Sequence, residues 1–313
     1  MTMNSANNDA VAEAPDPANY EDPVVWSIGI YTGETLKGLQ PAPAASNPVL
    51  SAQDVTDVRS SFVADPFMIN DGDRWHLFFE VWNLDAHKGD IGWAVSNDGL
   101  AWDYRRIVLT EPFHLSYPYV FREQGEYYMI PESYQANAVR VYRGDPFPEK
   151  WSLVEPILEG ELLDSSIFAF EGKWWLLTCP MASDDDVLEL FYADAVLGPW
   201  RRHPASPVIK GNDQIARPGG RVVMGDSGRP VRFTQACYPA YGMHIRGFEI
   251  TALNTSSYEE REIQQAPILL GGNQYWNRSG MHHVDPHRVN GKWLACVDGW
   301  RIEERPQVEK QAR

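Results

Sequence analysis

A polar residue, an apolar strand, a turn with glycine and an aromatic strand recur in that order along the chain. The four clearest copies begin and end 15 positions apart, at Asp65 and Glu80, Tyr117 and Glu132, Asp164 and Cys179, and His283 and Asp298. The first of them reads DPFMINDGDRWHLFFE. Such a pattern predicts a β-hairpin, whose first and last residues meet at the same end of the sheet.

Two further strand-like segments follow each hairpin, as in IGWAVSNDGLAWDYRRIVL after the first copy. The segment RPGGRVVMGDSGRPVRFTQ, which opens near Arg217 and ends at Gln235, is a less regular hairpin between the third and last copies. No segment of helical length has the 3.6-residue period of an amphipathic helix. Repeated units of four strands predict an all-β fold, a five-bladed β-propeller.

The last unit, which starts at His283, lacks two outer strands of its own. We expect the N-terminal segment VVWSIGIYTGETLKGLQPAPAASNPVL to supply them, so that strands from both chain ends close the ring. Residues 1–23 lack the basic and apolar regions of a signal peptide, and we expect a disordered leader there. Residues 24–313 then form a single propeller domain.

Composition narrows the range of partners. The 313 residues include 27 basic and 43 acidic side chains, giving a net charge of −16, and they contain no basic run. Nucleic acid and anionic membrane surfaces are therefore poor partners, whereas an acidic pocket favours neutral or cationic ligands. No apolar run approaches about 18 residues, so no membrane span is expected. Cys179, Cys237 and Cys296 form no CxxC pair, which indicates free thiols in a reducing compartment and a cytoplasmic location.

Five carboxylates are expected at the hairpin ends that surround the propeller axis: Asp65, Glu80, Glu132, Asp164 and Asp298. Carboxylates in a narrow channel repel each other, which raises some pKa values and places a protonated acid beside an ionised base. Glycoside hydrolysis uses such a pair. A single polar residue at a strand end more often caps a turn or faces solvent, whereas five on one face favour a site.

Other polar residues near the same face are candidate substrate ligands. Tyr117, Arg217 and Gln235 can hydrogen-bond a sugar, and Arg217 has the alternative of an ion pair with one of the acids. His114 is expected at the rim. The segment HHVDPH, residues 282–287, places His283 and two further polar residues on one side of a strand, where a metal site is an alternative to a substrate contact. Nucleophile-elbow, dinucleotide-binding and P-loop motifs are absent from the sequence.

Several motifs resemble a known bacterial and plant family, named for the N-terminal domain of glucosamine inositolphosphorylceramide transferase. They are VADPF, FFEVWN, IGWAVSNDGLAWDY, FHLSYPYVF, YYMIPES, DSSIF, KWWLLT and RPGG, and the resemblance extends from about Val24 to Trp300. This domain is in turn similar to the five-bladed propellers of glycoside hydrolase family 43 and its relatives. Plant members carry an attached glycosyltransferase domain that these 313 residues do not include, so the resemblance does not imply transferase activity.

The similarity to family 43 implies roles for particular positions. That family uses an Asp general base in the first blade, an orienting and pKa-tuning Asp in the third, and a Glu general acid that opens the fourth. Asp65 and Asp164 match the first two positions. The fourth blade opens with Arg217 instead, so the acid has to come from Glu132 or Glu80, or hydrolysis is altered or lost. Family 43 propellers also often place a last-blade His near an axial Ca²⁺, and SGMHHVD resembles that place through His282 or His283.

We therefore expect a glycoside hydrolase in which Asp65 is the general base or nucleophile, Glu132 the general acid and Asp164 the orienting group. The expected substrate ligands are Glu80, His114, Tyr117, Arg217, Gln235, His283 and Asp298. No cofactor is required, with an axial Ca²⁺ as the alternative. A non-hydrolytic sugar-binding or accessory domain fits the missing fourth-blade Glu, and a propeller transferase or lyase would need a bound metal or an activated donor sugar.

Overall fold

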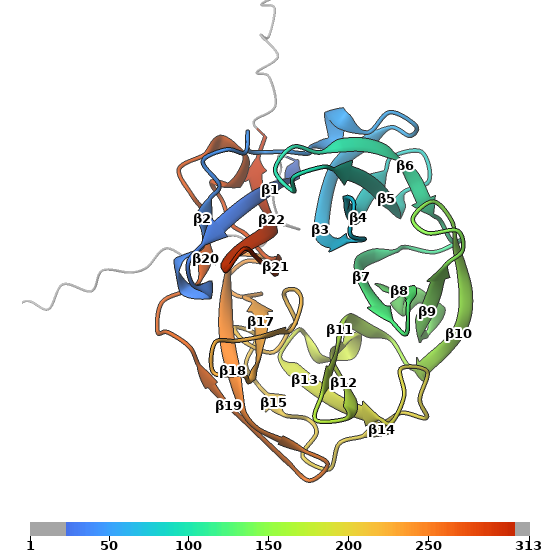
Figure 1. The fold of residues 1–313 in the computed structure, drawn as a ribbon, viewed down its shortest axis with the longest axis vertical. Helices are drawn as coiled ribbons and strands as arrows, with labels where there is room; N and C mark the ends of the chain where they lie inside the picture. The colour runs from blue at the N-terminus through green and yellow to red at the C-terminus, as the bar shows by residue number, and fades with distance from the viewer. Residues whose placement is uncertain (1–22, 304–313) are drawn as a thin grey trace, which may run out of the picture.

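Five antiparallel sheets surround a common axis in the computed structural model, which describes residues 23–303 (Figure 1). The predicted leader over residues 1–23 lies outside the described residues except for Pro23. Three sheets have four strands and two have five. The only helices in the described chain are short 3-10 turns, η2 (Leu36–Gly38), η3 (Ala52–Asp54), η4 (Tyr134–Ala136), η5 (Met181–Ser183) and η6 (Tyr275–Asn277). The prediction of a five-bladed, all-β propeller is confirmed.

The first four blades follow the order of the chain. The first blade contains β3 (Ser60–Asn70), β4 (Trp75–Asn83), β5 (Lys88–Ser96) and β6 (Asp103–Leu109). The second contains β7 (Ser116–Glu123), β8 (Glu126–Glu132), β9 (Ala138–Gly144) and β10 (Trp151–Glu159). The third contains β11 (Leu162–Phe170), β12 (Lys173–Pro180), β13 (Val187–Ala193), β14 (Arg201–Arg202) and β15 (Ile209–Lys210). The fourth contains β16 (Val223–Met224), β17 (Pro230–Gln235), β18 (His244–Asn254), β19 (Ser257–Glu262) and β20 (Leu269–Leu270).

The fifth blade joins the two ends of the described chain. Its inner strands are β21 (Val284–Val289) and β22 (Lys292–Ile302), and its outer strands are β1 (Val24–Gly33) and β2 (Gln40–Pro41). The blue β1 lies beside the red β22 in Figure 1, and the two pair from Val24 opposite Ile302 to Gly33 opposite Trp293. The predicted closure of the ring by strands from both ends is confirmed.

Apolar side chains of neighbouring blades pack against each other around the ring. Phe78 of the first blade, Ile130 of the second and Leu176 of the third are completely buried in one cluster. Ile28 of β1 and Phe79 of β4 are completely buried in another, which joins the fifth blade to the first. Because each strand exposes alternate side chains to its two faces, a blade buries one apolar set against each neighbour.

The inner strand of each of the first three blades contains a β-bulge near the axis. The pairing register shifts between Ala64 and Phe67, between Ser116 and Tyr119, and between Leu163 and Ser166. Asp65, Tyr117 and Asp164 lie inside these shifts, with positive φ angles of 53°, 45° and 48°. This left-handed backbone is uncommon for residues other than glycine, and a bulge redirects the side chain that it carries. In these three blades, the first residue of the 15-residue spacing is therefore the bulged residue. It comes directly after the residue that pairs with the last residue of the spacing on the returning strand.

Two further expectations from the sequence concern membrane-spanning segments and the cysteines. The described helices are all too short to span a bilayer. Cys179, Cys237 and Cys296 are free thiols, as expected.

Replacing Ile28 with alanine is expected to destabilise the protein by about 2–5 kcal/mol, because the buried strand that closes the ring would be left with a cavity. Val154→Ala on β10, where the side chain is 40% exposed, is the matched control and should change the free energy of unfolding by less than about 0.5 kcal/mol. Chemical unfolding followed by tryptophan fluorescence measures both variants. Equal effects of the two substitutions would contradict this account of ring closure.

Candidate functional site

The inner strands bring the five predicted carboxyl groups together at one end of the propeller axis. Asp65, Glu80, Glu132, Asp164 and Asp298 are all buried, with exposed fractions between 0% and 6%. The pKa of Glu80 is raised well above its usual value, first by burial and then by the charges of the other four. Hydrogen bonds join these positions, from the Asp65 N–H to Asp298 and from the Asp164 N–H to Glu132, so the hairpin ends converge, while the catalytic roles of these residues stay predictions.

A cavity of about 470 Å³ opens above Glu132 and Arg217. Aromatic side chains form part of its wall, and the lining includes Trp82, Phe113, His114, Tyr134, Gln135 and Met181. Aromatic faces combined with a few polar groups are typical of sites that bind small ligands. Sequence analysis expected His114 at the rim but missed the aromatic residues, which lie at the end of β4, in a short 3-10 turn and in a loop. The available signal was their position, since Trp82, Tyr134 and Met181 each follow the last residue of a 15-residue hairpin by two positions.

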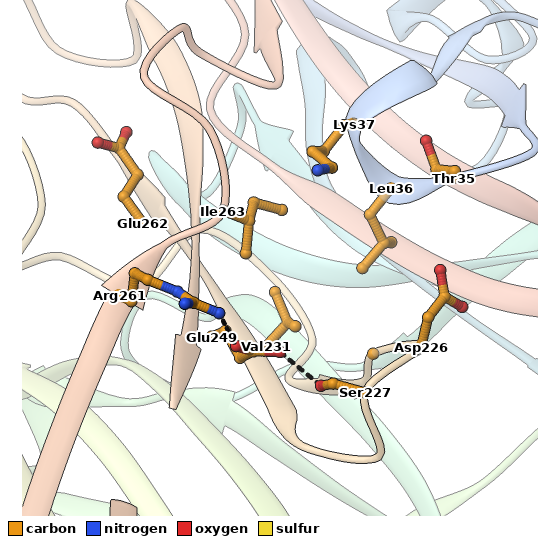
Figure 2. Close-up of a pocket in the computed structure, with 11 residues that line it drawn as sticks. Thr35, Leu36, Lys37, Asp226, Ser227, Val231, Glu249, Arg261, Glu262 and Ile263 are labelled. Carbon is orange, nitrogen blue, oxygen red and sulfur yellow. Dashed lines mark hydrogen bonds and ion pairs between the residues drawn. The ribbon is translucent and has the colours of Figure 1, made fainter. Parts of the chain in front are cut away.

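A second cavity, of about 380 Å³, lies elsewhere on the molecule (Figure 2). Its lining combines the apolar Leu36, Val231 and Ile263 with a polar side. On that side the Glu249 carboxylate accepts a hydrogen bond from Arg261 at 2.8 Å. None of the predicted site residues lines this cavity, so it offers a location for control substitutions.

Asp65 lies on the β3 bulge between the first, second and fifth blades. Its backbone N–H donates to Asp298 Oδ2 at 3.0 Å, and its own Oδ2 accepts from the Tyr117 N–H at 3.3 Å. Its Oδ1 lies 3.7 Å from His282 Nε2 and 3.6 Å from His283 Nδ1. Burial raises the pKa of Asp65 to about 7, and the charge of His282 is the strongest opposing influence. A carboxyl group with this pKa exchanges its proton near neutral pH, as a general base must.

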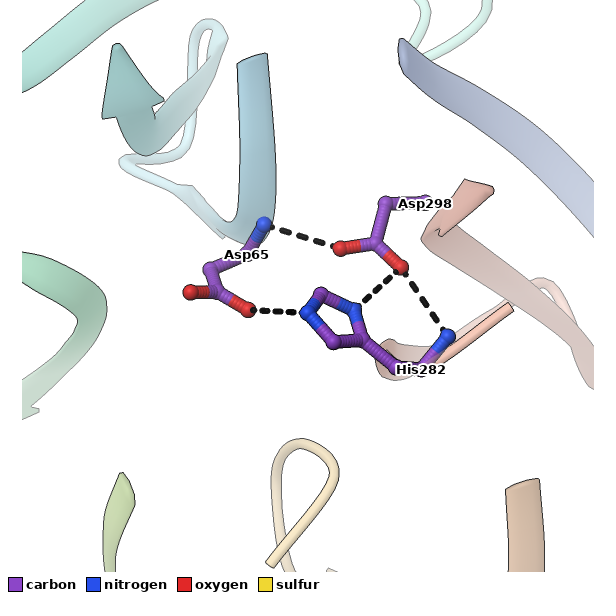
Figure 3. A group of neighbouring side chains, drawn as sticks. All are labelled: Asp65, His282 and Asp298. Carbon is purple, nitrogen blue, oxygen red and sulfur yellow. Dashed lines mark hydrogen bonds and ion pairs between the residues drawn. The ribbon is translucent and has the colours of Figure 1, made fainter. Parts of the chain in front are cut away.

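His282 and Asp298 form a buried ion pair next to Asp65 (Figure 3). His282 donates to Asp298 Oδ1 from Nδ1 at 2.8 Å and from its backbone N–H at 3.2 Å. Burial lowers the pKa of His282, but the Asp298 carboxylate outweighs that effect and raises it above its usual value. Likewise burial raises the pKa of Asp298, and His282 brings it below its usual value. Each partner of the pair thus favours the charged form of the other.

The axial Ca²⁺ considered as an alternative stays a prediction: one ligand atom from each of Asp65, His282 and Asp298 lies within 4.8 Å of the others, but only two of these residues offer oxygen. Ca²⁺ takes six to eight oxygen ligands. Asp65 and Asp298 are the carboxylates beside His282, and both oxygens of Asp298 already accept hydrogen bonds from Asp65 and His282. With Nδ1 hydrogen-bonded to Asp298, His282 does not offer both ring nitrogens to a metal. Nor do the polar residues of HHVDPH form one cluster, because Asp285 pairs instead with Arg221 and His287.

Arg217 occupies the opening of the fourth blade, where the family pattern has a Glu. Its Nε donates to Asp164 Oδ2 at 2.6 Å, its Nη1 to Asp185 Oδ1 at 2.9 Å, and its Nη2 lies 3.8 Å from Glu132 Oε2. Gln235 Nε2 donates to the same Asp164 oxygen at 2.8 Å. Of the two interpretations of Arg217 in the sequence, the structure therefore shows the ion pair. Asp185 was not predicted, because it lies in the loop after β12.

Glu132 receives a hydrogen bond from the Asp164 backbone N–H at 3.1 Å. Its pKa is raised well above the usual value, first by burial and next by the charge of Asp164, against the lowering effect of Arg217. This shift favours the protonated form of Glu132, which is the form a general acid requires. Asp164 contacts both Arg217 and Glu132, as its predicted orienting role requires.

Glu80 has no hydrogen-bond donor among residues 23–303. Its nearest basic group is His114, whose Nε2 lies 3.7 Å from Glu80 Oε1. Burial, and then the charge of Lys88, lower the pKa of His114 to about 4, so this histidine is neutral near pH 7. Glu80 and His114 can approach each other because residue 89 is a glycine: a Cβ at this position would lie 2.9 Å from Glu80 Oε1. Glu80 is therefore a buried carboxyl group without a counter-charge.

Two predicted substrate ligands are enclosed within the protein. Tyr117 is completely buried, and its hydroxyl contacts Ser166 Oγ at 2.8 Å, the Gly220 carbonyl at 3.0 Å and the Gly220 N–H at 2.7 Å. His283 is also completely buried, and neither ring nitrogen has a hydrogen bond in the described chain. Burial lowers its pKa to about 4, so its ring is neutral. We interpret Tyr117 as a link between the second, third and fourth blades, and its contact with substrate stays a prediction.

The chain is similar to proteins whose names concern glycolipid synthesis. The family model described as glucosamine inositolphosphorylceramide transferase 1, N-terminal, matches residues 19–300. Proteins named Glucosamine inositolphosphorylceramide transferase 1 from Oryza sativa subsp. japonica and Arabidopsis thaliana are 34% and 36% identical to this chain. Each alignment covers 88% of this chain, and 40% and 39% of the respective relative. The chain therefore spans about two fifths of the length of these relatives.

Solved structures share the architecture at low sequence identity. A Bacteroides ovatus structure described as that of a glycoside hydrolase matches with a TM-score of 0.63 and 12% identity, over 86% of this chain and 96% of that one. A thermostable family-43 glycoside hydrolase matches with a TM-score of 0.50 and 13% identity, over 64% and 75%. Identities this low show a common fold and nothing further.

Replacing Arg217 with methionine is expected to destabilise the protein by about 3–5 kcal/mol near neutral pH, because Asp164 and Asp185 would lose their shared counter-charge. The loss should be smaller at low pH, where the carboxyl groups are protonated. Arg261→Met removes an exposed ion pair beside the second cavity and should have little effect. Urea unfolding at several pH values measures both variants. A pH-independent loss in Arg217→Met would contradict the assigned counter-charge.

Proposed function

This chain belongs to the family of the glucosamine inositolphosphorylceramide transferase 1 N-terminal domain, and from that premise we propose that the cavity lined by Glu132 and Arg217 binds a glycoside and that the carboxyl cluster hydrolyses the glycosidic bond. The observation that carries the proposal is the convergence of buried carboxyl groups in one cluster, in which Asp164 is hydrogen-bonded to Glu132 and held by Arg217. Asp65 has a pKa of about 7, whereas the pKa of Glu132 is raised well above its usual value. One cluster thus offers a proton acceptor and a proton donor near neutral pH.

In the proposed reaction, protonated Glu132 donates its proton to the glycosidic oxygen as the bond from that oxygen to the anomeric carbon breaks. Ionised Asp65 acts on the anomeric carbon, either by taking a proton from the attacking water or as the nucleophile. One water is consumed, and the leaving group departs as an alcohol with the proton from Glu132. Asp164 orients the acid, because its backbone N–H is bonded to Glu132 and Arg217 fixes its side chain.

The charge of the cluster favours a cationic sugar. Glu80 is buried beside other carboxylates and has no basic partner apart from the neutral His114. A ligand ammonium group near Glu80 would supply the missing counter-charge and hydrogen-bond donors. The names of the plant relatives specify glucosamine, whose free amine is such a group. We therefore propose a glucosaminide as the substrate class.

A second candidate function is sugar binding without hydrolysis, as part of glycolipid synthesis. It is supported by Arg217, which stands where the family 43 pattern has its general acid and is paired with Asp164. In that case the same cavity would hold the sugar, and Glu132 would serve as a hydrogen-bonding group.

A panel of 4-nitrophenyl α- and β-glycosides, including glucosaminides and the matching N-acetylglucosaminides, tests the proposal. On any glycoside that the wild-type protein cleaves, Asp65→Asn and Glu132→Gln should each lower kcat/KM by about 10²–10⁴-fold, because one removes the base and the other the acid. Glu249→Gln in the second cavity is the control and should retain wild-type activity.

Full activity in both site variants would contradict the assigned roles. If calorimetry detects binding of glucosamine derivatives and no glycoside is cleaved, the second candidate replaces the first. If no sugar binds and none is cleaved, both are wrong.

The pH dependence of kcat/KM gives a further check. Activity should rise with pH through a midpoint near 7, because Asp65 must lose its proton to act and burial raises its pKa to about 7. At higher pH activity should fall as Glu132, whose pKa is also raised, loses the proton it has to donate. A profile that is flat between pH 5 and 7 would contradict the role of Asp65.

A further inference from the structure

We infer that His282 is a positioning residue, a fixed internal cation that holds the Asp65 carboxylate in place for the reaction. The inference relies on the proposed function for the task of Asp65, whereas the arrangement itself is a feature of the fold. His282 lies two residues before β21 and is only 4% exposed. The sequence pattern did not predict this role, because His282 precedes His283, the first position of the 15-residue repeat, and is not part of that repeat.

Asp298 fixes one side of the His282 ring and the backbone of Asp65 at once. Its Oδ1 accepts the two hydrogen bonds from His282, and its Oδ2 accepts the Asp65 backbone N–H at 3.0 Å. The opposite ring nitrogen, Nε2, then faces Asp65 Oδ1 at 3.7 Å, as Figure 3 shows. A single carboxylate therefore sets the distance between the imidazolium and the carboxyl group that it faces.

Aromatic rings enclose the imidazolium on its remaining sides. Trp26 of β1 stacks on His282 with ring centroids 3.9 Å apart and an interplanar angle of 26°. Tyr241 meets the ring edge-on at 5.3 Å. The face of an aromatic ring attracts a cation, most strongly for tryptophan. Gly242 allows this packing, because its φ is 73° and a Cβ there would lie 2.6 Å from Trp26 Cη2.

The charged groups that face His282 are the carboxylates of Asp298, Asp65 and Asp164, and all three favour its protonated form. The adjacent His283 has the opposite state. Burial makes it neutral, and the charge of His282 reinforces that effect. Of these two neighbouring histidines, His282 is thus the cation that faces Asp65. His283 is the neutral ring, with its centroid 4.5 Å from that of Phe67.

The first test is the protonation state of His282 in the wild-type protein. Long-range ¹H–¹⁵N spectra of the histidine rings, with His282 assigned through His282→Asn, should show both ring nitrogens protonated at pH 7 and above. A neutral His282 ring at pH 7 would overturn the inference. Addition of EDTA should leave the His282 signals unchanged, and a change would overturn it in favour of a metal site. These spectra use the wild-type chain, so they decide the matter even if the variant folds poorly.

The second test is the titration of Asp65, followed by the ¹³C signal of its side-chain carboxyl and assigned through Asp65→Asn. His282→Asn keeps a donor for Asp298 but removes the charge, so the Asp65 midpoint should move upward by about 1–3 pH units. His287→Asn, which removes a histidine that pairs with Asp285, is the control and should leave the midpoint unchanged. An unchanged midpoint in His282→Asn would overturn the inference.

Activity separates this inference from the proposed function. If a glycoside is cleaved, the rising limb of the kcat/KM profile should move upward in His282→Asn together with the Asp65 midpoint, with KM little changed. If no glycoside is cleaved, the proposed function fails while the two spectroscopic tests still decide the role of His282.

Discussion

The concentration of carboxyl groups at the propeller axis is the constraint on which the rest of the site depends. Burial and mutual repulsion make several ionised carboxylates in one dry cluster unfavourable. The protein meets this cost with two internal cations, Arg217 beside Asp164 and His282 beside Asp298. Glu80 has no such partner, and for Glu132 burial and the charge of Asp164 outweigh Arg217, which is why the pKa values of both groups are raised well above their usual values.

The strands that close the ring also carry residues that position the site. The β1 strand pairs with β22 along its whole length, and the same strand carries Trp26, which stacks on His282. Asp298, on β22, then holds both His282 and the backbone of Asp65 in the first blade. The two ends of the described chain therefore meet where Asp65 is positioned. A fifth blade that packs less tightly would change the position of Asp65.

The sequence permitted the prediction of the blades and of the converging carboxyl groups, because both follow from a repeat of fixed length. The bulges that hold Asp65 and Asp164 are invisible in that pattern, although they account for its odd spacing. Which acids face Arg217 and His282 also could not be derived, since Asp164 and Asp185 reach Arg217 from the third blade and Asp65 reaches His282 from the first. Local periodicity specifies a strand, whereas the protonation of a buried group depends on neighbours that only the closed ring assembles.

The central claim is that the cavity above Glu132 presents the carboxyl cluster to a sugar. A crystal structure of the protein with a glucosamine-derived iminosugar would test it most directly. The account predicts a ring in the axial cavity, with its anomeric position between Asp65 and Glu132 and its amine near Glu80. A ligand in the second cavity, or one in the axial cavity with no contact to any of these three carboxyl groups, would contradict it.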